Sequence, residues 1–127
     1  MMDGSELIQQ ERHHQIHYEG WTEEHDDHHC DGSLVWAAIC YAAPQVVLRE
    51  ERLIGVTLFS DVWPSSWATT WDKRRRLSGQ VVNNEELPMD ERIRNLVKAG
   101  ALIAAEVDRL RRLMTKEYSP NLKGGPQ

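Results

Sequence analysis

This chain of 127 residues has no long apolar run, no positive net charge and only two cysteines. Each of these features argues against a class of protein. No stretch approaches the roughly 20 apolar residues of a membrane span, and the acidic start has no apolar run behind it to form a signal peptide. The net charge of −5 argues against nonspecific binding to duplex nucleic acid. We therefore expect a cytoplasmic protein that binds neither a membrane nor duplex nucleic acid.

The only cysteines are Cys30 and Cys40. If they lie on one continuous helix, their spacing of ten residues corresponds to about 15 Å, which is too far for a disulfide bond. The sequence also lacks a Gly-rich phosphate loop, a nucleophile elbow and a cysteine-pair zinc motif. These absences are typical of a protein from a reducing compartment and leave the common enzyme motifs unmatched.

Helical spacing of apolar residues is the main pattern that is present. A first helix is expected from Ser5, which can cap it, to about Tyr18, with Gly20 as a plausible stop. A second helix should cover the almost uniformly apolar run 34–42 and be the most buried element, and Pro44 should end it.

Residues 46–59 favour a small β-hairpin. Apolar segments at 46–48 and 53–59 flank the charged segment 49–52, which we expect to be the turn. Because an isolated hairpin is only marginally stable, it should pack on the helices. Continued helix is the alternative for this region.

The clearest element begins at Pro88 and keeps one face apolar to about Lys116. At about 1.5 Å per residue it would be about 42 Å long, so it should span the molecule and overhang it, which indicates a homodimer through this C-terminal helix. The sequence thus predicts a mainly α protein: a small helical bundle over residues 1–118 with a short β-hairpin and a long C-terminal helix. Residues 119–127 should form a disordered tail.

The densest chemistry lies between Glu19 and Gly32, where five carboxylates, three histidines and a thiol fall within ten residues. Like charges this crowded repel one another unless a cation joins them, so the stretch predicts a metal site. Magnesium or manganese would suit the carboxylates, and zinc, which is less favoured here, would suit the histidines. The candidate catalytic residues are Glu24 and Asp27. The candidate metal ligands are Glu23, Glu24, Asp27, His28 and, from the last helix, Glu106.

Other interpretations of this stretch stay open. The acids can simply face the positive end of a helix while the histidines are exposed. Alternatively, cations from the chain itself, the basic run 73–76 and the basic face of the last helix, neutralise the acids in structural salt bridges. In the third interpretation these cations bind phosphate beside the metal, and Arg75 and Lys98 are the candidates.

Three tryptophans, Trp63, Trp67 and Trp71, are spaced by four residues in an expected loop over 60–80. They can fill a gap in a small core, since buried aromatic side chains are common core anchors. Alternatively, Trp67 and Trp71 stack on a nucleotide base or contact a partner, because long loops in compact domains are often functional.

These motifs together resemble a family of small proteins encoded by phages and prophages. The likeness extends from about Glu11 to Arg112 and implies a phage accessory role in the cytoplasm of the host cell. It is carried by Glu-Gly-Trp-Thr-Glu-Glu-His-Asp-Asp-His-His at 19–29, the Ala-rich run 34–42, the element 63–67, and Lys-Ala-Gly-Ala-Leu-Ile-Ala-Ala-Glu-Val-Asp-Arg-Leu at 98–110.

The chain is more distantly similar to the MazG-like all-α nucleotide pyrophosphohydrolases. These bind Mg²⁺ through a Glu-Glu-x-x-Glu motif and a later Glu-x-x-Asp motif on neighbouring helices, and generally work as oligomers. Glu23, Glu24 and Asp27 match the first motif, with Asp in the last place. The second motif is missing, because Glu106-Val-Asp108 has a different spacing and lies farther along the chain.

Two functional hypotheses follow. The first is a phage-encoded, metal-dependent nucleotide-phosphate hydrolase. The alternative is a non-enzymatic phage accessory or anti-defence protein that binds a host protein or sequesters a signalling nucleotide, with the tryptophan loop and the basic helix as its binding surface.

Overall fold

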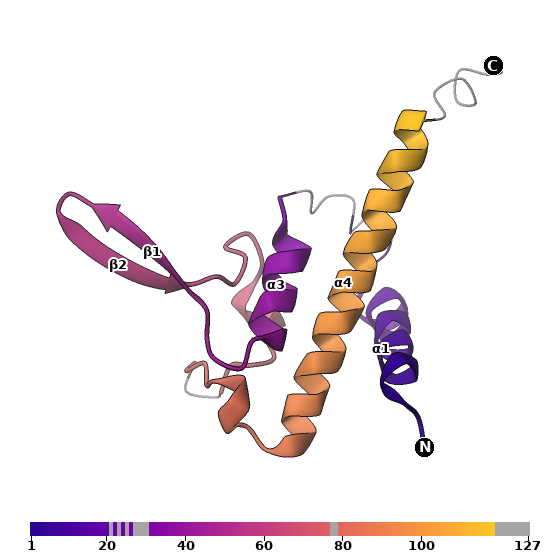
Figure 1. Ribbon diagram of the computed structural model, residues 1–127, viewed down its shortest axis with the longest axis horizontal. Helices are drawn as coiled ribbons and strands as arrows, with labels where there is room; N and C mark the ends of the chain where they lie inside the picture. Colours follow the sequence, from indigo (N-terminus) through magenta and orange to yellow (C-terminus); the bar gives the residue numbers. More distant parts are fainter. Residues whose placement is uncertain (21, 23, 25, 27–30, 77–78, 119–127) are drawn as a thin grey trace.

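A computed structural model describes residues 1–20, 22, 24, 26, 31–76 and 79–118. Figure 1 shows its helices α1 (Gly4–Tyr18), α3 (Ser33–Ala42) and α4 (Met89–Tyr118) and one antiparallel hairpin, β1 (Leu48–Leu53) with β2 (Val56–Asp61). Short 3₁₀ turns, η1 (Thr69–Trp71) and η2 (Asn84–Glu86), lie between the hairpin and α4. The prediction of a mainly α fold with a short hairpin and a long C-terminal helix is confirmed.

Helix α1 begins one residue before Ser5, and Ser5 is not its cap. The carboxylate of Asp3 accepts a hydrogen bond from the backbone N–H of Glu6 at 2.9 Å, and the Glu6 carboxylate accepts one from the Asp3 N–H at 3.3 Å. This reciprocal capping box satisfies two backbone donors at the start of the helix. The predicted stop at Gly20 is confirmed by its left-handed φ of 76°.

Helix α3 forms because its apolar side chains repeat with helical spacing. Leu34, Ala37, Ala38 and Tyr41 share one face and are all buried. Six of the ten residues of α3 are buried, a larger share than in α1 or α4, which confirms the prediction that this is the most buried element. Trp36 of this helix is nevertheless 39% exposed. The helix ends at Ala42, two residues before Pro44, as predicted.

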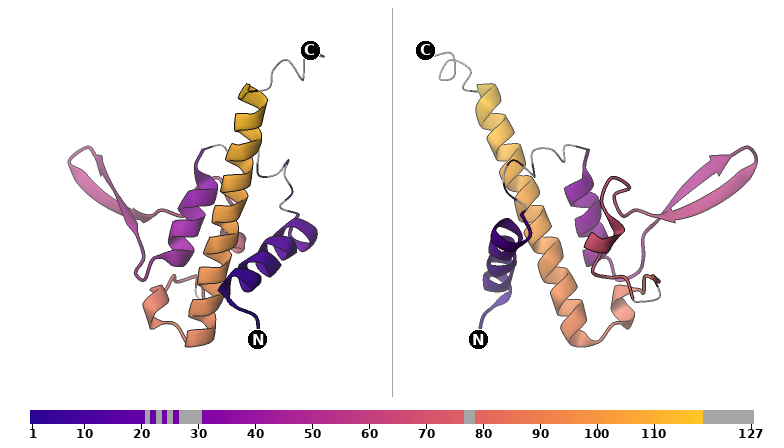
Figure 2. Two further views of the ribbon diagram at one scale, coloured as in Figure 1. Left: turned by 45° about the vertical axis from the view of Figure 1, so that its right-hand side comes forward. Right: turned by 180° about the vertical axis from the view of Figure 1, so that it is seen from behind.

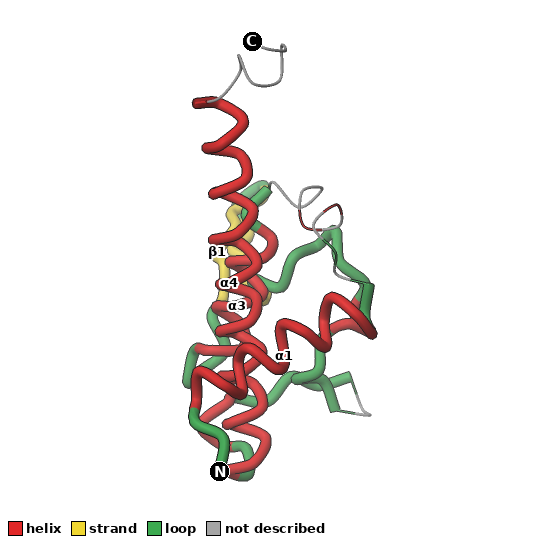
Figure 3. The backbone as a smooth tube through the Cα atoms, turned by 90° about the vertical axis from the view of Figure 1, so that its right-hand side faces the viewer, coloured by secondary structure: helices red, strands yellow, loops and turns green. Residues whose placement is uncertain are grey.

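Helix α4 lies between the other two described helices, with α3 on one side and α1 running obliquely across it on the other (Figures 2 and 3). Its small and apolar residues Ala99, Leu102 and Ala105 are buried with the inner face of α3. At Gly100 a Cβ atom would stand 2.6 Å from Cδ1 of Ile8, so glycine permits the close approach of α1. The C-terminal turns of α4 extend past both neighbours (Figure 1).

The hairpin differs from the prediction in its turn and in its packing. The turn is formed by Ile54 and Gly55, whose φ angles are 49° and 76°, and the charged segment 49–52 is part of β1. A two-residue turn with both central φ angles positive matches the twist of paired strands, which explains why the chain turns here. Register pairs Leu48 with Asp61 and Leu53 with Val56.

The expectation that the hairpin packs on the helices is wrong. Every residue of β1 is exposed, and in β2 only Asp61 is partly covered. Figure 1 shows the ribbon projecting away from the helices. Its apolar side chains therefore face solvent in the single chain.

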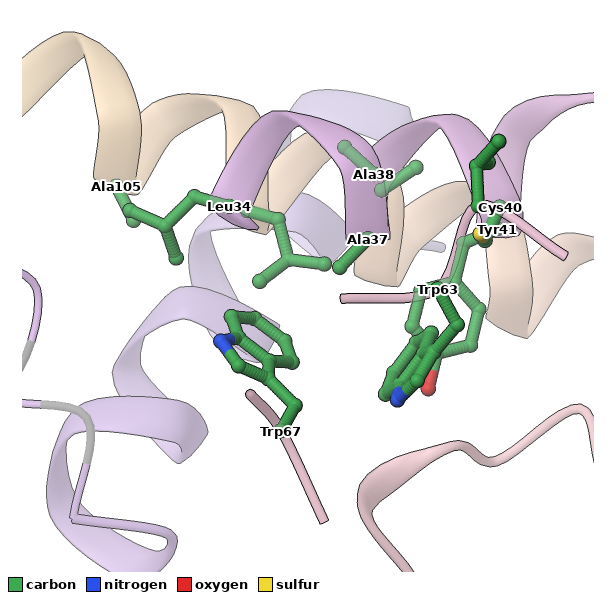
Figure 4. Packing of buried hydrophobic residues seen from close by; sticks show 11 residues of the cluster. Leu34, Ala37, Ala38, Cys40, Tyr41, Trp63, Trp67 and Ala105 are labelled. Carbon is green, nitrogen blue, oxygen red and sulfur yellow. The ribbon is translucent and has the colours of Figure 1, made fainter. Parts of the chain in front are cut away.

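The tryptophan loop closes the core, as one of the two interpretations predicts. Trp63 and Trp67 are 9% and 4% exposed, and Figure 4 shows them beneath α3. Edge-to-face contacts run from Tyr41 to Trp63, from Trp63 to Trp67 and from Trp67 to Trp71, with ring centroids 5.9, 5.5 and 5.6 Å apart. Such aromatic pairs contribute roughly 0.5–1.5 kcal/mol each beyond their buried area.

Candidate functional site

The acidic stretch is described only in part. Three of its predicted site residues lie outside the described residues: Glu23, Asp27 and His28. The fourth, Glu24, is helical and exposed. Asp26 is fully buried, and its Oδ2 lies 2.7 Å from Nη2 of Arg12 in α1. The backbone N–H of Asp26 donates to the carbonyl of Thr22 at 2.9 Å, which closes one helical turn. One acid of the stretch is thus held by a cation of the chain itself.

The other predicted polar residues are also engaged by internal partners. Lys98 Nζ lies 2.9 Å from Oε2 of Glu11, and the Glu106 carboxylate forms a two-point contact with Arg109 at 2.7 and 3.0 Å. Arg75 donates to the carbonyl of Gly79 at 3.0 Å. Among the residues that the structure describes, no group of three or more acids, histidines and cysteines is placed to hold a metal ion.

His13 and His14 of α1 line a groove of about 610 Å³ between α1 and the first half of α4. His13 and His17 lie with ring centroids 4.1 Å apart, as their spacing of one turn predicts. His14 Nε2 is 3.4 Å from Oε1 of Glu19, and Glu11, three residues before His14, bonds to Lys98. The groove has an apolar wall that includes Ile93 and Val97.

A much smaller cavity brings together three predicted site residues from distant segments. Lys98, Trp67 and Trp71 line a space of about 20 Å³ with Gln15 and Glu19, large enough for about one water molecule. Trp67 is nevertheless a core residue with 4% exposure, so its ring is not accessible to a nucleotide base, contrary to the prediction. Trp71 is 39% exposed and stays available for a contact.

The feature that sequence reasoning missed is a buried charge cluster around Arg74. This side chain is 2% exposed and contacts two acids: its Nη2 lies 2.8 Å from Oδ2 of Asp61 and 2.9 Å from Oδ2 of Asp72. Its guanidinium also lies 5.6 Å from the ring centroid of Trp63. Although burial opposes the charge of Arg74, the hydrogen bonds to Asp72 raise its pKa above the usual value.

Cys40 belongs to the same cluster. Its Sγ–H donates to Oδ1 of Asp61 at 3.5 Å. Burial raises the pKa of the thiol to about 12, and the nearby charge of Arg74 offsets this only in part. Since the thiolate is the reactive form of cysteine, this side chain is a structural group and not a nucleophile.

Apolar surface is the remaining candidate feature. On α4, apolar residues that recur at steps of three and four along one face are about half exposed. They are Met89, Ile93, Leu96, Ile103, Val107, Leu110 and Met114. On the hairpin, the exposed apolar residues are Leu48, Leu53, Ile54, Val56, Leu58 and Phe59. Exposed apolar patches of this extent mark protein interaction sites in soluble proteins.

In the part of the chain that the structure describes, no helix combines the length and the apolar character needed to cross a membrane. Comparisons with protein-family models, with curated proteins and with solved structures found no match.

Proposed function

We propose that this chain is a non-enzymatic accessory protein of phage origin that binds other proteins through the apolar surfaces its own fold leaves uncovered. A second copy pairs along α4, and a host protein binds at the hairpin. The observation that carries the proposal is the exposure of both surfaces, with Leu96 of α4 at 55% and Phe59 of β2 at 64%. The likeness to phage-encoded proteins supports the accessory role and the host cytoplasm as its place of action.

The seam of α4 is complementary to itself in an antiparallel register. Its positions 89, 93, 96, 100, 103, 107, 110 and 114 alternate in steps of four and three, the spacing of a coiled-coil interface. A twofold axis between residues 101 and 102 would place Ile93 against Leu110 of the second copy, and Leu96 against its Val107. Ile8 of α1 covers Gly100 near this axis, so the pairing uses the apolar residues of α4 on either side of that crossing.

Charge favours the same register. Asp90 and Arg111 both flank the seam. In the antiparallel arrangement Asp90 of each copy would lie close to Arg111 of the other copy. The two helix dipoles would also oppose each other. The pairing is isologous, as in most twofold dimers, because the same surface is used on both copies.

The hairpin suits a partner that supplies a β-strand. A two-stranded hairpin alone is marginally stable, and addition of a third strand satisfies backbone groups that are otherwise left to water. The edges differ: β1 carries Arg49, Glu50, Glu51 and Arg52, whereas β2 has no charge over 56–60. Charged edge strands resist pairing, so the host protein should add its strand beside β2.

Affinity capture with quantitative mass spectrometry tests this surface. Purified wild-type protein and the variant Leu58→Lys are compared as baits in lysate of the bacterial host, with Glu51→Lys as the matched control on the neighbouring strand. The proposal predicts a host protein that is lost with Leu58→Lys and retained with Glu51→Lys. Equal capture by all three baits, or capture of nothing above background, contradicts it.

The metal-dependent nucleotide-phosphate hydrolase is the second candidate function. It rests on the likeness of Glu23, Glu24 and Asp27 to the first motif of the MazG-like enzymes, with Mg²⁺ or Mn²⁺ as the metal. Incubation with a panel of nucleoside triphosphates and either metal tests it, with Glu24→Ala as the inactive variant. Turnover that disappears in Glu24→Ala would replace the binding proposal, and no turnover with either metal would remove the hydrolase.

A further inference from the structure

A separate cavity of about 130 Å³ opens beside the first turn of α3. Its walls come from three parts of the chain: Ser33 of α3, Arg49 at the base of the hairpin, and the segment from Trp63 to Ser66. None of these residues takes part in the proposed dimer seam. Polar groups predominate in the lining, which sets this cavity apart from the apolar groove on α1.

Two buried donors in this lining lack a partner. Ser33 is 2% exposed, and Trp63 is 9% exposed. Among the described residues, none accepts a hydrogen bond from the Ser33 hydroxyl or from Nε1–H of Trp63. A buried polar group left unpaired costs roughly 1–3 kcal/mol, so a group that accepts hydrogen bonds is expected in the cavity.

Charge and backbone geometry specify the sign of that acceptor. The guanidinium of Arg49 lies 5.3 Å from the ring centroid of Trp36, so its cation is held at the rim. The hydroxyls of Ser65 and Ser66 add further donors. Ser33 is the first residue of α3, so the positive end of the helix dipole lies beside the cavity. Asp31 is the one acid in the lining, and its carboxylate accepts from the backbone N–H of Ser33 at 3.1 Å.

We propose that this cavity, formed by Ser33, Arg49, Trp63, Ser65 and Ser66, binds the phosphoryl group of a phosphate monoester or free phosphate. The cation of Arg49 and the two buried donors favour an anion over a cation in this cavity. A space of about 130 Å³ is large enough for one phosphoryl group. The sugar and base of a nucleotide would stand outside, next to the half-exposed ring of Trp36.

Titration calorimetry at low ionic strength tests the site with two probes, inorganic phosphate and adenosine 5′-monophosphate. Arg49→Gln should weaken binding of either probe by about tenfold or more, because a charge-assisted hydrogen bond is lost. Ser33→Ala, which removes only the hydroxyl, should weaken it several-fold. Tighter binding of the nucleotide, lost in Trp36→Ala, identifies a nucleotide ligand, and equal affinities identify free phosphate.

Arg52→Gln is the matched control. Arg52 lies on the same strand with an 82% exposed side chain, and a separation of three residues places it on the opposite face of the ribbon from Arg49. Both variants remove one positive charge from exposed positions, so neither threatens folding. Equal weakening by the two variants would mean bulk electrostatics only and overturn the site. Absence of binding at millimolar phosphate would overturn it as well.

Discussion

Arg74 differs from its neighbours Arg75 and Arg76 only in what the fold places around it. Its partner Asp61 comes from the end of β2 and Asp72 from the loop, so the cluster depends on how the hairpin joins the loop. A run of four basic residues contains no signal for which one is buried. The sequence likewise contains no signal that Asp26 pairs with Arg12, which lies in α1. Pairing across elements is therefore the part of the chemistry that the sequence could not predict.

Replacement of Arg74 by methionine should strongly destabilise the protein. The change leaves Asp61 and Asp72 without their common cation, and removal of one partner from a buried ion pair costs about 3–5 kcal/mol. Urea unfolding followed by tryptophan fluorescence measures the loss. Arg76→Met is the control, because Arg76 pairs with Glu91 at 3.1 Å near the surface and should cost less than about 1 kcal/mol. Equal losses for the two variants would contradict the buried cluster.

The thiol of Cys40 should be unreactive in the folded protein and should make stability depend on alkaline pH. Its pKa rises from 9.0 to about 12 on folding, so the unfolded chain loses this proton first. The contribution is fully present below about pH 9 and is lost as pH rises towards 12. In a Cys30→Ser background, a thiol reagent at pH 8 should react only after urea is added. Rapid labelling of the native protein would show that the thiol is accessible.

At the scale of elements, the helices were predictable because their apolar residues repeat along one face. The boundaries of α1 and α4 differ from expectation by one or two residues, since Gly20 follows the end of α1 and Pro88 precedes the start of α4. The hairpin turn was misplaced because Ile54 is β-branched and nothing in its type indicates a φ of 49°. The charged residues 49–52 instead looked like the turn, although they lie within an exposed strand.

Ile54→Asn should strengthen the hairpin. Isoleucine is strained at positive φ, while asparagine followed by glycine is the preferred pair for this turn, so a gain of about 1 kcal/mol is expected. The side chain of Ile54 is fully exposed, so no packing is lost. Amide exchange of the strand residues should slow by about fivefold. Gly55→Ala should speed exchange, because Gly55 has a φ of 76°. Faster exchange in Ile54→Asn would contradict the turn geometry.

At the scale of the molecule, α4 is where the parts meet, and it has more apolar surface than α1 and α3 cover. Its periodicity predicted the face, but only the fold reveals that α3 packs behind that face and α1 crosses it at Gly100. For the candidate site, the sequence likewise predicted the residues but not their partners. The tryptophans, Lys98 and the acids were named from their chemistry, and their partners, Glu11 and the core beneath α3, come from distant segments.

The claim that uncovered apolar surface is protein interface is tested most directly by sedimentation equilibrium of the purified protein. For the wild type we predict twice the chain mass of 14.7 kDa at micromolar concentration, and for Ile103→Glu the mass of one chain, because a charge would be buried in the seam. Asp108→Lys, a charge change at an exposed position outside the seam, should leave the dimer intact. A wild-type protein that sediments as a single chain at all accessible concentrations would contradict the account.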